Sequence, residues 1–292
     1  MPTFDTNQPI VASIEMSQGA VHVIAAHRTD AVVAVNPSDR DRPEDVDAAG
    51  RTVVDLANGT LSIRAPRPRG IAEHLGRKPI GSIEVTVELP EGSSLRADAG
   101  FADVRCDGRL DDVDVKTGAG DVRLDQTGAV RVHSGAGRVS VEEASGRAEI
   151  VTAGDMSVGV VGGDADLKNL NGTTWIGRVR GDARVRSANG DVTIDDAGGD
   201  VTVRTANGNV RLGRVARGSV TIATGSGGLE LGVAEGTAAW IDAATKFGRV
   251  HNDLTSADDP ERSDETVQVR ARTGFGDVLI ARSWVPDRRG EA

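Results

Sequence analysis

Short runs of alternating apolar and polar residues recur along the chain from about residue 95 onward. Val122-Arg123-Leu124 and Val192-Thr193-Ile194 place apolar side chains at every second position, which is the period of a β-strand with one buried face. A second set of runs lies between the first, as in Val130-Arg131-Val132 and Val201-Thr202-Val203. The pattern predicts two short strands in each unit of a repeat.

Hydroxyl or amide residues mark one corner of each repeat, and each is followed by a glycine-containing turn and a strand. The steps between them are 17, 18, 17, 18, 18, 19, 21 and 28 residues, which is typical of a chain that coils on itself. This predicted structural turn ladder consists of Thr117, Ser134, Thr152, Asn169, Ser187, Thr205, Thr224, Thr245 and Thr273. Nine equivalent side chains cannot all be nucleophiles, so we interpret them as hydrogen-bonding partners of the turn backbone.

Two topologies fit two strands per repeat. An antiparallel meander would need about eighteen strands in one open sheet, more than the ~10 at which such sheets usually curl or split. In a β-solenoid, equivalent strands stack in parallel and like residues lie above like. We therefore expect an all-β fold, a β-solenoid with two short strands per rung of 17–19 residues, wound as a right-handed parallel β-helix.

The predicted organisation has three parts. Residues 95–283 form the regular solenoid repeats. Residues 1–94 form an irregular N-terminal β region, either early rungs or a capping sheet, because a solenoid needs its open ends covered. A Pro-containing loop at 65–82, with one helical turn, interrupts this region, and an acidic segment at 255–265 is looped out. Residues 284–292 form a C-terminal tail.

Composition narrows the function classes. A formal net charge of -10 argues against a non-specific nucleic-acid surface. No stretch approaches the roughly 20 apolar residues of a membrane span, and the N-terminus has no basic segment followed by an apolar run. These features predict a cytoplasmic protein. Cys106 is the one cysteine, so it cannot form an intramolecular disulfide, and we interpret it as a small packed thiol.

No metal site or cofactor is expected. The five histidines lack close ligand spacing, and His22 with His27 is the nearest pair. Four aspartates follow glycine at the same corner, which invites comparison with calcium-binding nonapeptide rolls, but such rolls need the motif at every turn of roughly nine residues. We therefore interpret these residues as turn-forming. They are Asp121, Asp155, Asp191 and Asp277.

Three acidic pairs raise the possibility of an enzyme that cleaves polysaccharides. They are Asp111-Asp112, Asp195-Asp196 and Asp258-Asp259. Adjacent residues on a strand point to opposite faces, so such a pair needs a neighbouring rung to provide two cooperating carboxylates. A non-enzymatic role is therefore favoured.

Charge pairing across stacked strands identifies one candidate binding patch. Arg131 is expected beside Glu149, and Asp166 beside Arg184, as complementary pairs. The adjacent row reads Lys168, Arg186 and Arg204. Three like charges at strand spacing are unfavourable unless diagonal acids or a ligand relieve them, so these residues are the candidate anionic-partner patch; solvated side chains that splay apart are the alternative.

The turn sequences carry a family resemblance. Residues 205–213, Thr-Ala-Asn-Gly-Asn-Val-Arg-Leu-Gly, and residues 271–278, Ala-Arg-Thr-Gly-Phe-Gly-Asp-Val, resemble the bacterial putative-adhesin family of β-strand-repeat proteins, a domain of unknown function. The resemblance covers nearly all of the sequence. It implies a β-solenoid and assigns no catalytic or cofactor residues.

The expected function is a non-enzymatic interaction or scaffold protein that offers long flat faces to a protein partner or to copies of itself. The alternatives are a carbohydrate-active β-helix enzyme and an exported surface adhesin. Trp175 and Trp240 are expected at outward positions, either as contact patches or packed under a loop.

Overall fold

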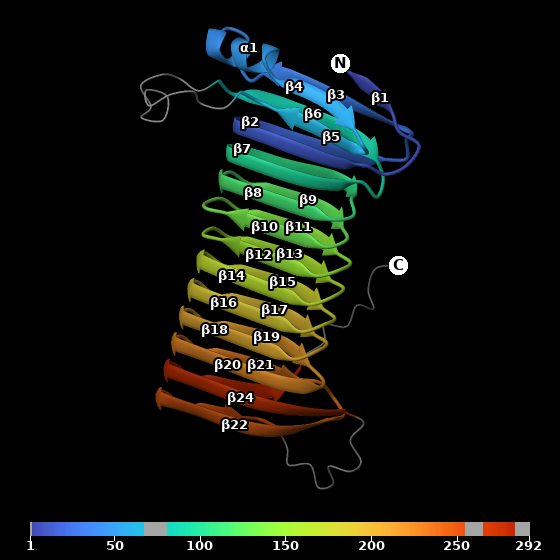
Figure 1. The fold of residues 1–292 in the computed structure, drawn as a ribbon. Coiled ribbons are helices and arrows are strands. Elements are labelled where there is room, and N and C mark those ends of the chain that lie inside the picture. Colours follow the sequence, from blue (N-terminus) through green and yellow to red (C-terminus); the bar gives the residue numbers. More distant parts are fainter. Residues whose placement is uncertain (1, 67–80, 255–264, 284–292) are drawn as a thin grey trace, which may run out of the picture. The chain divides into compact units, whose positions relative to one another are not determined.

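The structure is a computed structural model that describes residues 2–66, 81–254 and 265–283. The described residues form one α-helix and 25 strands (Figure 1). The chain divides into two compact units, residues 1–154 (unit 1) and residues 155–292 (unit 2). The predicted helical turn near residue 71, most of the predicted acidic loop and the C-terminal tail lie outside the described residues.

Unit 1 contains twelve of the described strands and the helix. They are β1 (Thr3–Asp5), β2 (Val11–Ala26), β3 (Asp30–Pro37), α1 (Pro43–Gly50), β4 (Val53–Ala57), β5 (Thr60–Arg64), β6 (Ile83–Pro90), β7 (Ser94–Arg109), β8 (Val113–Ala119), β9 (Val122–Thr127), β10 (Val130–Ser134), β11 (Val139–Ala144) and β12 (Ala148–Thr152).

Unit 2 contains the other thirteen described strands. They are β13 (Met156–Val161), β14 (Ala165–Asn171), β15 (Thr174–Val179), β16 (Ala183–Asn189), β17 (Val192–Ala197), β18 (Val201–Asn207), β19 (Val210–Val215), β20 (Gly218–Ser226), β21 (Leu229–Val233), β22 (Thr237–Phe247), β23 (Val250–Asn252), β24 (Glu265–Phe275) and β25 (Val278–Arg282).

Parallel pairing between alternate strands establishes the topology. In unit 2, β14 pairs in parallel with β16 and β16 with β18, whereas β15 pairs with β17 and β17 with β19. In unit 1, β8, β10 and β12 pair in the same way. Each rung thus contributes one strand to each of two parallel walls. The β-solenoid prediction is confirmed, and the right-handed winding stays a prediction.

The core consists of aliphatic side chains stacked in register. Val185 on β16, Val203 on β18 and Ile222 on β20 lie side by side, and each is at most 1% exposed. Each buried side chain of this size contributes about 1.5–3 kcal/mol to the free energy of unfolding. Since each rung is thin, small aliphatic residues fill it without large aromatic rings.

The N-terminal region combines rungs with a cap. The long strand β2 pairs in parallel with β7 on one side and with β5 and β6 on the other, so it forms a rung out of sequence order. Beyond it, β3 pairs antiparallel with β6, β4 pairs antiparallel with β5, and β1 pairs antiparallel with β3. The described part of this region therefore contains parallel rung strands and an antiparallel group of outer strands.

The end of unit 2 also departs from sequence order. The order of the predicted polar ladder along the chain places Thr245 beside Thr224. In the structure β24 lies between β20 and β22, so Thr273 has Thr224 on one side and Thr245 on the other. In β24, Val267 and Val269 are buried, whereas their register partners in β22, Ala239 and Ile241, are only half-buried. β24 thus takes the interior position, where its inward side chains are covered by β20 on one side and by β22 on the other.

A substitution at a corner glycine tests the stacking. Gly190 has φ +124, and a Cβ atom there would lie 2.0 Å from the backbone oxygen of Gly172 in the adjacent rung. Because alanine adds both a steric clash and backbone strain, Gly190→Ala is expected to lower the free energy of unfolding by about 3 kcal/mol or more. Chemical denaturation measures the loss.

Gly236→Ala is the matched control. Gly236 also has a positive φ, of +74, but a Cβ atom there would meet nothing within 4 Å. Its loss should therefore be limited to the backbone term of about 1–2 kcal/mol. Equal losses for the two variants would contradict close stacking at the corner.

Candidate functional site

Three cationic side chains lie in one row on the outer face of unit 2. Lys168 is on β14, Arg186 on β16 and Arg204 on β18, and the strand register places each beside the next. All three are exposed. Within the part of the chain that the structure describes, none of them makes an ion pair or a side-chain hydrogen bond. We refer to these three residues as the cationic row.

Acidic side chains are scarce around the cationic row. Along β14, β16 and β18 the acidic residue is Asp166, whose Oδ2 lies 3.9 Å from Nη1 of Arg184 in the neighbouring row. This is the pair that the sequence predicted. On the other side of the cationic row the strands carry the exposed Leu170 and the small Ala188 and Ala206. The face is therefore locally positive on a chain whose net charge is -10.

Several arginines of unit 2 are paired with acids. On the opposite wall, Oδ2 of Asp196 accepts a hydrogen bond of 3.0 Å from Arg178 Nε, and its Oδ1 accepts one of 3.1 Å from Arg214 Nη1. Arg211 Nε lies 3.7 Å from Glu230 Oε2. The cationic row differs from these arginines because no acid among the described residues pairs with it.

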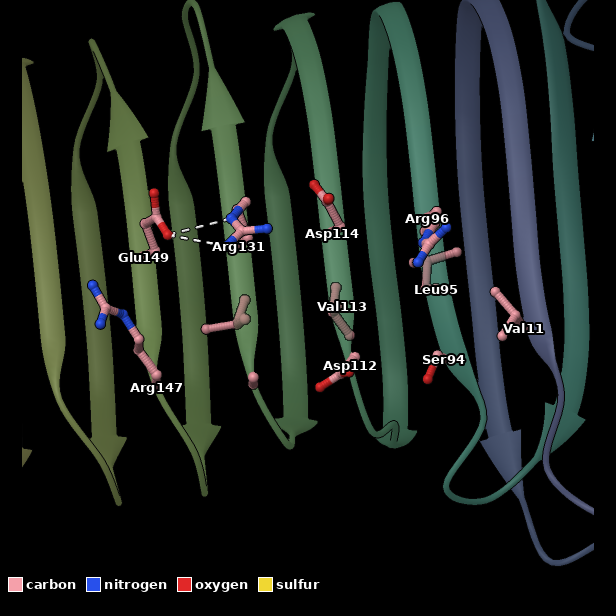
Figure 2. A pocket seen from close by; sticks show the side chains of 12 residues that line it. Val11, Ser94, Leu95, Arg96, Asp112, Val113, Asp114, Arg131, Arg147 and Glu149 are labelled. Atoms are coloured by element: carbon pink, nitrogen blue, oxygen red, sulfur yellow. Dashed lines mark hydrogen bonds and ion pairs between the residues drawn. The ribbon is translucent and has the colours of Figure 1, made fainter.

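Unit 1 shows the paired arrangement on a comparable face. The register there alternates positive and negative residues: Arg96 beside Asp114, Asp114 beside Arg131, and Arg131 beside Glu149. Figure 2 shows this row, and Arg131 Nε donates a hydrogen bond of 3.3 Å to Glu149 Oε2 as the sequence predicted. The side chains border an open depression of about 350 Å³. The charged side chains of this row therefore lie beside residues of opposite charge.

The polar ladder has a structural role. Thr117 Oγ1 donates a hydrogen bond of 3.0 Å to the carbonyl oxygen of Ala119, and Ser134 Oγ donates one of 3.0 Å to that of Ala136. Thr152, Asn169, Thr205, Thr224, Thr245 and Thr273 donate to corner carbonyls in the same manner. Ser187 is the exception, since its Oγ is buried without a partner among the described residues.

The corner aspartates bridge successive rungs, which is the role that the sequence reading missed. Their Oδ1 atoms accept backbone N–H groups one rung away, with Asp121 accepting from Arg138 at 2.9 Å and Asp191 from Asn209 at 2.8 Å. Asp155 and Asp277 do the same. Among the described residues, no group of three His, Cys, Asp or Glu side chains is placed to hold a metal ion.

The second corner carries an aspartate ladder of its own. Asp164 Oδ1 accepts the backbone N–H of Asp182 at 3.0 Å, and Asp182 Oδ1 accepts that of Asp200 at 2.9 Å. A Cβ atom at Gly199 would lie 2.6 Å from Asp182 Oδ1. The glycines at this second corner, such as Gly181 and Gly199, therefore leave room for the carboxylate of the adjacent rung. The Gly-Asp dipeptide, repeated every 18 residues at 163–164, 181–182 and 199–200, was the available signal.

The acidic pairs are held in structural contacts. Asp195 Oδ2 accepts a hydrogen bond of 3.1 Å from Trp175 Nε1, and Asp196 lies between two arginines. Asp112 borders the depression in unit 1, and Asp111 lies beside Gly128 at a corner. Asp258-Asp259 lies outside the described residues.

The remaining titratable candidates are also accounted for. Cys106 is 2% exposed, and burial raises the pKa of its thiol, so it is held as a neutral thiol. His22 pairs with Asp107 rather than with His27, with 2.6 Å between His22 Nε2 and Asp107 Oδ2. A hydrogen bond from Arg105 lowers the pKa of Asp107, and the hydrogen bond with His22 lowers it further.

Comparison with known families identifies the fold. A family model described as Toastrack DUF4097 matches residues 12–283. The chain belongs to the Toastrack family. The resemblance to the putative-adhesin domains of unknown function is thereby confirmed. No helix among the described residues of this Toastrack chain is long and apolar enough to cross a membrane.

Three solved structures are similar to the Toastrack chain at low identity. A putative adhesin from Bacteroides fragilis is 13% identical with a TM-score of 0.35, and 96% of each chain is covered. A putative cell adhesion protein from Clostridium sporogenes is 9% identical with a TM-score of 0.21, covering 96% of this chain and 97% of the other. A putative lipid binding protein from Parabacteroides distasonis is 8% identical with a TM-score of 0.33, and 96% of each chain is covered. At these TM-scores the structures carry no argument about a binding site. A search of curated proteins finds no match.

Charge reversal within the cationic row tests its electrostatics. In Arg186→Glu, the new carboxylate lies between Lys168 and Arg204 and replaces two repulsive contacts by two attractive ones. We expect the free energy of unfolding to rise by about 0.5–1 kcal/mol. Arg178→Glu is the control, since it places an acid beside Asp196 and should lower the free energy of unfolding. Equal losses in both variants, measured by urea denaturation, would show that the row is not under repulsion.

The hydrogen bonds of Asp107 with Arg105 and His22 predict that the stability of the protein depends on pH. Because the pKa of Asp107 is lowered from 3.8 in the folded protein, its contribution to stability is complete above about pH 5 and is lost as the pH falls through the folded pKa. Thermal melting between pH 7 and pH 2 should therefore show a smaller loss of stability for Asp107→Asn than for the parent. Glu142→Gln, at an exposed acid without a described ion pair, should leave the parent profile unchanged.

Proposed function

We propose that this Toastrack chain is a non-enzymatic interaction module whose cationic row binds an acidic segment of a partner protein. The observation that carries the proposal is the row itself: three exposed like charges in register, unpaired among the described residues. Such a row costs stability through repulsion, and an anionic partner would relieve it. The nearby cations of the opposite wall have acids of their own.

The spacing of the row fits a helical acidic segment. Stacked strands lie about 4.8 Å apart, and carboxylates on one face of an α-helix recur with each turn of about 5.4 Å. Three acids spaced by one turn would thus face Lys168, Arg186 and Arg204, within the reach of their flexible side chains. Each arginine can hold a carboxylate through two parallel N–H donors.

A non-enzymatic role is supported by the use of the acidic residues. Glycoside cleavage needs two carboxylates facing one substrate. In the described pairs, Asp195 is engaged by Trp175 and Asp196 by two arginines. A carbohydrate-active enzyme and an exported adhesin are alternatives that no contact in the described residues favours. The cytoplasmic location stays a prediction.

A binding assay with a matched charge control tests the proposal. The probe is a fluorescein-labelled helical peptide with glutamate at i, i+4 and i+7, titrated with the full chain and followed by fluorescence anisotropy. The variant Lys168→Gln, Arg186→Gln, Arg204→Gln should bind at least tenfold more weakly, because it removes the three facing charges. Raising the salt concentration should weaken binding to the parent.

The control removes the same net charge from the opposite wall. Arg178, Arg211 and Arg214 are changed to Gln, and binding should fall less than threefold. Equal weakening of both variants would assign the effect to net charge alone. Binding that is unchanged in the cationic-row variant would refute the proposed site.

A further inference from the structure

The last rung of unit 2 ends in a long free strand edge. β22 has 11 residues and pairs in parallel with β24 on one side (Figure 1). Among the described residues, no strand pairs with its other side. The N–H and C=O groups along such an edge form a template for pairing with another strand.

The side chains of this rung are only partly covered. Ile241 is half-buried, although its neighbour Val269 in β24 is fully buried. Trp240 is 56% exposed and Phe247 is 64% exposed. The Phe247 ring stacks on that of Phe275 with centroids 4.8 Å apart and planes at 7°. Unit 2 thus ends in a partly apolar surface, and the stacked rings of Phe247 and Phe275 are part of it.

The outer strands of unit 1 are much shorter than β22. β1, with 3 residues, and β4, with 5, are the short outer strands of its antiparallel cap. Very short edge strands are a common protection against pairing with other chains. β22 lacks this protection: it is long, contains no proline and carries only Asp242 and Lys246 as charged residues.

We propose that the β22 edge pairs with the β22 edge of a second copy of this chain, in an antiparallel, two-fold symmetric dimer centred on Ala244. In this register Asp242 lies opposite Lys246 of the second copy, and the symmetry forms the pair twice. Lys246 makes no ion pair with any described residue of its own chain. The dimer supplies its missing partner.

The same register matches the apolar side chains. Trp240 lies opposite Gly248 of the second copy, where the absence of a side chain leaves room for the indole ring. Phe247 lies opposite Ile241 of the second copy, so that two partly exposed apolar groups cover each other. A shift by two residues keeps the outward faces together but loses both Asp–Lys pairs. The charges therefore select one register.

Sedimentation of the full chain tests the dimer. Analytical ultracentrifugation over a concentration series should show a monomer–dimer equilibrium. Lys246→Glu replaces two attractive contacts by two repulsive ones and should raise the dissociation constant at least tenfold. Lys116→Glu, at an exposed lysine of β8 in unit 1, makes the same charge change away from the edge and should leave the equilibrium unchanged. No acidic peptide is present, so the outcome is independent of the proposed function.

Cross-linking tests the register. Ala244→Cys places two thiols on the symmetry axis at a separation compatible with a disulfide, and mild oxidation should give a covalent dimer. Ala206→Cys, exposed on the same wall but away from the edge, should not cross-link, and the native Cys106 is buried. A chain that stays monomeric at about 100 µM, a dimer unaffected by Lys246→Glu, or equal cross-linking of both cysteine variants would overturn the proposal.

Discussion

The in-register parallel stacking of rungs, about 4.8 Å apart, is the constraint on which the structure depends. It converts each position of the repeat into a row of like residues. Rows of aliphatic residues such as Val185, Val203 and Ile222 form the core. By the same geometry, the row of Lys168, Arg186 and Arg204 brings like charges together on neighbouring strands.

The corners hold the stacking in register. Hydroxyl and amide side chains donate to turn carbonyls of their own corner or of an adjacent rung, and aspartates accept N–H groups from the next rung. Glycines leave space for the backbone of the adjacent rung and for the aspartate carboxylates. Most polar groups of the corners are thus satisfied internally, so the stacking does not depend on the exposed charges of the outer faces. The cationic row stands on rigid strands rather than on loops.

The sequence predicted the features that depend on one repeat and its neighbour. The two-strand rung, the polar ladder and the pairs Arg131–Glu149 and Asp166–Arg184 all follow from the period of the repeat. The order of the end strands does not, because β2, β22 and β24 carry the same alternation wherever they stack. The contact between His22 and Asp107 depends on β2 lying beside β7, so the repeat pattern of the sequence did not predict it either.

Disulfide trapping between adjacent rungs tests the parallel register most directly. Thr202 and Thr221 are register partners on β18 and β20, so cysteines at these two positions should form a disulfide under mild oxidation. Cysteines at Thr202 and Ser219 are offset by two residues, beyond the reach of a disulfide. The account predicts efficient closure of the first pair and none of the second. Closure of the offset pair instead would contradict the stacking.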